Sequence, residues 1–202
     1  MNLICSLLLT VALTLWQPAF AVPQSESAED TVNNLHAELL LAMQLPEKTS
    51  VAKRIETLKP VIEASFDFTT IAKIILGDSW PTLSNEQRSL FQDTLQRLSV
   101  ATYADHFSKF SGEKFLVTKV NDKKQLTIVD TRLIPVNGSV DDKSISMRYL
   151  LTRKDDRWQI INVIAQGVSD LALKQAEYAY VIKKDGFKGL VSQLNDKIVN
   201  LQ

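Results

Sequence analysis

The chain has 202 residues, enough for one domain with a substantial hydrophobic core, and no Pro-, Gly- or Ser-rich stretch divides it. Lysine plus arginine and aspartate plus glutamate each number 23, so the formal charge is zero. This balance argues against a nucleic-acid partner, because neutralising phosphates requires a basic surface. The single cysteine, Cys5, lies near the N-terminus, which excludes disulfide bonds, thiol catalysis and cysteine metal sites elsewhere.

The first 21 residues are typical of an export signal. They contain no charged side chain, are almost entirely apolar from Leu3 to Trp16, and end in the small-x-small pattern Ala19-Phe20-Ala21. We predict cleavage after Ala21, which leaves residues 22–202 as a single domain. A retained membrane anchor is the alternative, although the apolar run is shorter than the ~20 residues that a spanning helix needs.

The next part of the chain has the periodicity of α-helices. Apolar residues at helical offsets predict a helix over residues 29–44, with Asp30 available as its cap. A second helix is expected to begin after Ser50. Pro60 is expected to kink or restart this helix, because proline lacks a donor and disfavours helix at the preceding residue.

Two further helices have recognisable start signals. Asp67 can cap a short helix, which Gly77 is expected to end. Ser84 and Gln87 form a capping-box pattern, so a long helix should follow. Its apolar positions include Phe91, Leu95, Leu98, Tyr103, Phe107 and Phe110.

Beyond Gly112 the apolar spacing changes to the period of two that is typical of strands. It predicts four strands, which carry Phe115 and Val117, then Val129, Thr131 and Leu133, then Ile145, Met147, Tyr149 and Leu151, and finally Trp158 and Ile160. Asn137-Gly138 and Asp155-Asp156 are expected to form the turns that join the last three strands. Ser169 can cap a following helix, and two stripes of apolar residues at helical spacing follow it.

These elements predict an α+β fold. A four-stranded antiparallel curved sheet should be packed by N-terminal, long central and C-terminal helices around an apolar pocket.

The order and spacing of several motifs resemble the toluene-tolerance or MlaC family of periplasmic lipid carriers. The motifs are Phe66-Asp67-Phe68, Ile71-Ala72, Leu76-Gly77, Trp80, Ser84-x-Glu86-Gln87, Phe91, Ala101-Thr102-Tyr103, Trp158-x-Ile160, Gly167-Val168-Ser169, Gly186-Phe187 and Leu190. The resemblance implies a periplasmic, non-enzymatic protein without a cofactor that binds phospholipid tails between a curved sheet and helices. It implies transport partners in both membranes, namely an inner-membrane ABC transporter assembly and an outer-membrane lipoprotein complex or RND-type exporter.

Two positions depart from the pattern of many MlaC proteins. Asn162 stands where an aspartate is common, and Lys174-Gln175 replaces a Tyr-Arg pair. The run from Ser169 to Tyr178 is closer to the hopanoid-associated branch called HpnM. This resemblance implies that the ligand is a hopanoid in place of a two-chain phospholipid.

The candidate lipid-binding residues are the apolar side chains expected to face the pocket. They are Phe68, Ile71, Ile75, Phe91, Leu95, Tyr103, Phe107, Val129, Leu133, Met147, Tyr149 and Trp158. The same stripes also suit a closed core in which helices pack directly on the sheet.

Two other functions compete with the carrier. A cavity-type isomerase or hydratase would need Asp130 with Tyr103 or His106 as its acid-base pair, but the alternation of the strand turns Asp130 toward solvent. A protein-binding adaptor would use the apolar stripes as a groove for a partner helix. We predict no catalytic residue and no metal site, because His36 and His106, the only histidines, lack metal-ligand spacing.

Overall fold

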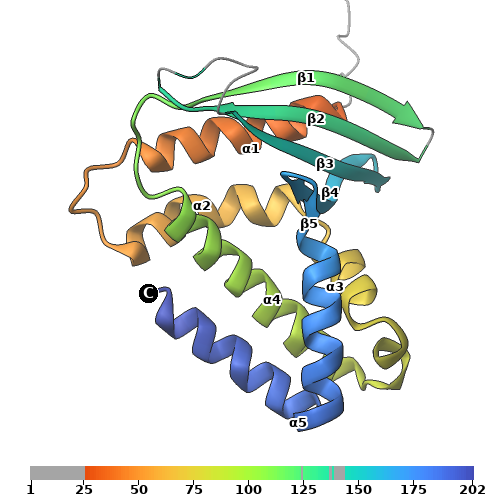
Figure 1. The fold of residues 1–202 in the computed structure, drawn as a ribbon. Coiled ribbons are helices and arrows are strands. Elements are labelled where there is room, and N and C mark those ends of the chain that lie inside the picture. The colour runs from red at the N-terminus through yellow and green to blue at the C-terminus, as the bar shows by residue number, and fades with distance from the viewer. Residues whose placement is uncertain (1–25, 124, 137, 139–143) are drawn as a thin grey trace, which may run out of the picture.

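The computed structural model describes residues 26–123, 125–136, 138 and 144–202. It has the predicted α+β class, with an antiparallel sheet covered on one face by helices (Figure 1). The expected export signal lies outside the described residues.

The first two helices begin at serine caps. Helix α1 covers Ala28–Met43, and its cap is Ser27, whose side chain accepts from the backbone N–H of Asp30. The Asp30 carboxylate accepts from the backbone N–H of Ser27 in return, so Asp30 completes a capping box and is not itself the expected cap. Helix α2 covers Val51–Ser65 and continues through Pro60 without a restart. Pro60 and Glu56 are exposed, so the carbonyl that loses its partner lies on the solvent side.

Helices α3 and α4 have the predicted signals at their ends. In α3, Phe68–Leu76, the Asp67 side chain accepts from the backbone N–H of Thr70, and Gly77 follows the helix with a φ of +47°. A 3₁₀ helix, η1, covers Gly77–Thr82. Helix α4 covers Asn85–His106 and begins at the capping box of Ser84 and Gln87. It ends at His106, before Phe110, which is exposed.

The sheet has five strands, one more than predicted. Strands β1 (Lys114–Lys123), β2 (Leu126–Ile134), β3 (Ile145–Lys154), β4 (Arg157–Ala165) and β5 (Val168–Ser169) pair antiparallel in chain order. Strand β5 has only 2 residues, too few to show any periodicity. Asp155 and Asp156 have φ values of +49° and +60°, which confirms the predicted tight turn. Asn137 lies outside the described residues.

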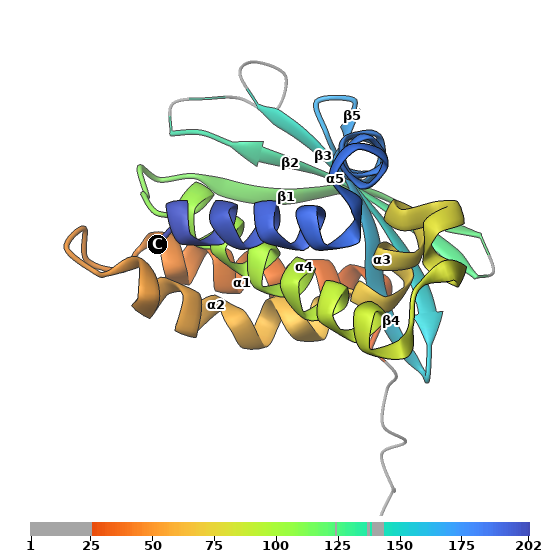
Figure 2. The same cartoon turned by 90° about the horizontal axis from the view of Figure 1, so that it is seen from below.

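Helix α5, Asp170–Asn200, contains a break at Gly186, where φ is +71° and ψ is 178°. The break separates the two helical stripes that the sequence predicts. The first half descends from β5 beside α3, and the second half turns back along α4 (Figure 1). Figure 2 shows this second half from below, where it covers the helical layer.

The core extends from the inner face of the sheet, where α1 contacts β1, β2 and β4, into the layer formed by the other helices. Val129 and Tyr149 are opposite each other on β2 and β3, and both are fully buried. The Tyr149 hydroxyl lies 2.9 Å from Nε2 of His36 on α1, and the His36 ring stacks on Phe115 of β1. Burial lowers the pKa of His36 to about 4, so the imidazole is neutral at physiological pH.

Candidate functional site

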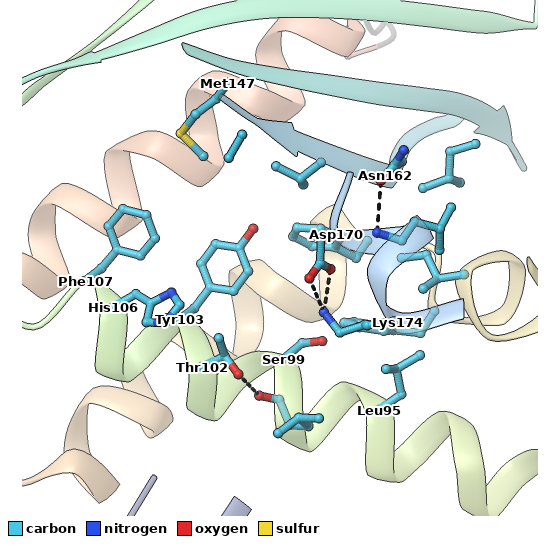
Figure 3. Close-up of a pocket in the computed structure, with 18 of the residues that line it drawn as sticks. Leu95, Ser99, Thr102, Tyr103, His106, Phe107, Met147, Asn162, Asp170 and Lys174 are labelled. Carbon is cyan, nitrogen blue, oxygen red and sulfur yellow. Dashed lines mark hydrogen bonds and ion pairs between the residues drawn. The ribbon is translucent and has the colours of Figure 1, made fainter. Parts of the chain in front are cut away.

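A cavity of about 370 Å³ lies between the sheet, α3, α4 and the first half of α5 (Figure 3). This volume is within the range of small-molecule sites, about 300–1,000 Å³. Its walls come from segments far apart in the chain, because α3 and α4 converge with α5 under the end of the sheet that carries Leu133 and Met147.

Most of the candidate lipid-binding residues line this cavity. The lining residues among them are Phe68, Ile71, Leu95, Tyr103, Phe107, Leu133 and Met147. Aromatic contacts hold part of this wall in place, since Tyr103 stacks on Phe107 with 5.6 Å between ring centroids and meets Phe66 edge-on at 5.8 Å. The cavity therefore has a largely apolar surface with a rigid aromatic side.

The other candidates lie away from the cavity. Ile75, Phe91, Val129 and Tyr149 are closed core residues with exposed fractions of 1% or less, and Trp158 is half-buried against the core. Phe91 packs edge-on against Tyr178 of α5 with 6.3 Å between centroids, which leaves no space for a ligand at this helix crossing. These residues have the expected inward direction, but other side chains cover them.

Sequence reasoning missed part of the lining on β4. Ile161, Asn162 and Val163 all border the cavity, although consecutive strand residues normally alternate between faces. The register shift opposite Leu150 and Leu151 leaves Ile161 as an extra residue of β4, so the regular alternation is interrupted beside Asn162. Asn162 within an otherwise apolar strand is the sequence signal that could have suggested the site.

A second missed part is the start of α5. Asp170 and Leu171 lie one helical turn before Lys174, and all three border the cavity. Lys174 donates from Nζ to both carboxylate oxygens of Asp170. These residues form the polar end of the cavity (Figure 3).

The phenol of Tyr103 points into the cavity from α4 (Figure 3). Burial raises the pKa of this phenol above its ordinary value, and the nearby negative charge of Asp170 adds to the effect. Tyr103 therefore stays protonated and can donate a hydrogen bond into the cavity.

The acid-base pair of the enzyme hypothesis is not brought together. Tyr103 and His106 border the cavity, whereas Asp130 lies in a shallow groove on the opposite face of the sheet. There its carboxylate accepts a 2.6 Å hydrogen bond from Nε of Arg148. Within the described ranges, no group of three or more His, Cys, Asp or Glu side chains could hold a metal ion.

The fold and the cavity define a small α+β binding domain with an apolar interior site. A family model described as MlaC protein matches residues 33–196, so the chain belongs to the MlaC family.

A solved structure, the phospholipid-binding protein from Ralstonia solanacearum in complex with a phospholipid, is similar with a TM-score of 0.74 and 19% sequence identity. The similarity covers 86% of this chain and 98% of that one. At this level of identity it shows that the two proteins share a fold.

No helix in the described part of the chain combines the length and apolar composition needed to cross a membrane.

Proposed function

We propose that the protein is an exported, periplasmic lipid carrier without enzymatic activity. The observation that carries the proposal is the cavity of about 370 Å³, whose lining is mostly apolar, in a chain of the MlaC family. The Ralstonia solanacearum protein, which has the same fold, is described as phospholipid-binding and was solved with a phospholipid. Lipid tails would occupy the space bordered by Phe68, Ile71 and Phe107, with the polar head at Asp170 and Lys174.

The energetics of an apolar cavity suit exchange with membranes. Removing one methylene from water is worth about 0.8 kcal/mol, so long tails would not leave the cavity for water. The interior of a bilayer is equally apolar, so the free energy of transfer between membrane and protein is small. Such a balance allows a carrier to load and unload without an energy source of its own.

The proposed role is to shuttle lipid between an inner-membrane ABC transporter assembly and an outer-membrane lipoprotein complex or RND-type exporter. We propose a hopanoid as the favoured cargo and a phospholipid as the alternative, on the resemblance of the run from Ser169 to Tyr178 to the HpnM branch.

The two departures from many MlaC proteins have structural roles here. Asn162 Oδ1 accepts from the Ser169 hydroxyl at 3.1 Å, and Gln175 Nε2 donates to the Ile74 carbonyl at 3.1 Å. These bonds join α5 to β4 and to α3, so they position the wall of the site whichever lipid it holds.

The test is native mass spectrometry of mature protein isolated from its own periplasm, followed by organic extraction and identification of the lipid. We expect one hopanoid or phospholipid per protein. The variant Ile71→Trp should fill the cavity and reduce occupancy at least several-fold, because Ile71 borders the cavity and is half-buried.

The matched control is Leu41→Trp, which adds the same side chain at a position that is 54% exposed on α1. It should retain full occupancy. A lipid-free wild-type protein would contradict the carrier proposal and favour the adaptor. Full occupancy in a folded Ile71→Trp variant would place the lipid elsewhere.

A further inference from the structure

The ionisable side chains at the polar end of the cavity determine which lipid head groups it can accept. Its lining contains one carboxylate, Asp170, one ammonium, Lys174, and one imidazole, His106. The negative charge of Asp170 and the positive charge of Lys174 offset each other.

The one lysine of the lining is already paired. Both carboxylate oxygens of Asp170 accept from Lys174 Nζ, one helical turn away on α5. The Lys174 side chain is only 23% exposed, while Asp170, at 62%, lies at the mouth. An incoming anionic group that approached Lys174 would therefore also approach the charge of Asp170.

The groups that remain available at this end are neutral. Tyr103 Oη, Asn162 Nδ2 and Ser99 Oγ border the cavity and make no hydrogen bond to any other residue in the described ranges. Each can donate a hydrogen bond to a hydroxyl, a carbonyl or an ester oxygen. These three hydrogen-bond donors can therefore bind the polar head of a lipid whether or not that head is charged.

We infer that the cavity selects lipids whose polar head carries no net charge, zwitterionic or hydroxylated, over lipids with a net anionic head. This inference rests on the proposed lipid-carrier function and narrows its substrate class. A net anionic head gains no net attraction from the Asp170–Lys174 pair. A zwitterionic head can place its phosphate at Lys174 and its ammonium at Asp170, and a hydroxylated head can use the neutral donors alone.

The test compares two lipids with identical tails. Wild-type protein is incubated with vesicles of equimolar phosphatidylcholine and phosphatidylglycerol, separated from them and extracted, and the ratio of the two bound lipids is measured. We expect phosphatidylcholine to exceed phosphatidylglycerol on the wild-type protein.

Charge variants then change the ratio in opposite directions. Asp170→Asn leaves Lys174 unpaired and should raise the share of phosphatidylglycerol about fivefold, the upper end for a partly exposed ion pair. Lys174→Gln leaves Asp170 unpaired and should lower that share by a similar factor. The double variant Asp170→Asn/Lys174→Gln is neutral again and should return to the wild-type ratio.

Asp130→Asn is the matched control, because it also removes a carboxylate from an ion pair, with Arg148, on the opposite face of the sheet. Its ratio should equal that of the wild type. If Asp170→Asn does not fold, Lys174→Gln and the double variant provide the same comparison.

A wild-type preference for phosphatidylglycerol, or equal ratios in the wild type and both single variants, would overturn the inference and leave the carrier proposal intact. Failure to bind either lipid, with a lipid-free protein from the periplasm, would overturn both.

Discussion

The inner face of the sheet has two regions that differ in what covers them. At one, Val129 and Tyr149 face each other beneath α1 and are fully buried. At the other, Leu133 and Met147 on the same two strands and the same face border the cavity. The difference lies in the helices, since α1 closes the first region while α3, α4 and α5 leave a space under the second. A strand residue that faces inward thus becomes core or cavity wall according to the helix that lies over it.

The largest predicted effect extends the comparison of closed core and cavity wall to two phenylalanines of α4 and its C-terminal end. Phe91→Ala should lower the free energy of unfolding by about 3–5 kcal/mol, because it removes a fully buried ring and leaves a void. Phe107→Ala should cost only about 1–2 kcal/mol, since this ring borders an existing cavity and is half-buried. Urea unfolding of both variants without lipid measures the difference. Equal losses would mean that the cavity is packed as tightly as the core.

A second prediction concerns pH and affects the closed region. The pKa of His36 is about 4 in the folded protein, below the ordinary 6.5 that applies when the chain is unfolded. The unfolded state therefore binds the proton more readily, so this contribution to stability is complete above pH 6.5 and is lost as the pH falls toward 4. The loss amounts to about 3 kcal/mol.

The variant His36→Gln isolates this effect. Glutamine does not titrate, and its amide can still pair with the Tyr149 hydroxyl. The difference in unfolding free energy between wild type and variant should change by about 3 kcal/mol between pH 7 and pH 4. A difference that stays constant with pH would show that the imidazole is not shielded from water by Phe115 and α1.

The smallest predicted effect concerns α3, which carries both a residue of the cavity wall, Ile71, and a residue of the closed core, Ile75. Asp67→Ala removes the cap of this helix and should lower the free energy of unfolding by about 1–2 kcal/mol. Asp67→Asn should cost less, because an amide oxygen can still accept from the backbone N–H of Thr70. Thermal unfolding of the two variants measures this order, and a larger loss in Asp67→Asn would contradict the capping role.

The surroundings of Asp67 favour the ionised form of its side chain. Burial alone would raise its pKa, but hydrogen bonds from the side chain and backbone of Thr70, with the charge of Lys154, lower the pKa overall. The cap is therefore ionised at neutral pH.

The helices and hairpins could be predicted because their signals are local. Ser84 with Gln87, and Asp155 with Asp156, determine a helix start and a tight turn through bonds within a few residues. The sequence did not predict strand β5, because its 2 residues are too few to show the period of a strand. They are recognised as a strand only by their pairing with β4. Pro60 was expected to interrupt α2. It lies on the exposed side of the helix, where water can replace the missing backbone hydrogen bond, so the loss of free energy is small.

The cavity could be predicted only in part. The alternation of the strands places Val129 and Met147 on the inner face, but their different surroundings depend on packing between distant helices. The β-bulge beside Asn162 depends on the register of β3 and β4, which the sequence of one strand does not determine. The sequence singled out Lys174 only as a departure from the family pattern, and its ion pair with Asp170 at the polar end of the cavity is known from the structure.

The pairing order of the sheet has a consequence for how the protein reaches this structure. Each strand pairs with its neighbour in the chain, so the sheet closes only short loops and has a low contact order. The cavity, in contrast, needs Phe66, Leu95 and Lys174 to meet, and that costs more loop-closure entropy. The sheet should therefore assemble early in folding, and the binding space should be among the last parts of the molecule to acquire its shape.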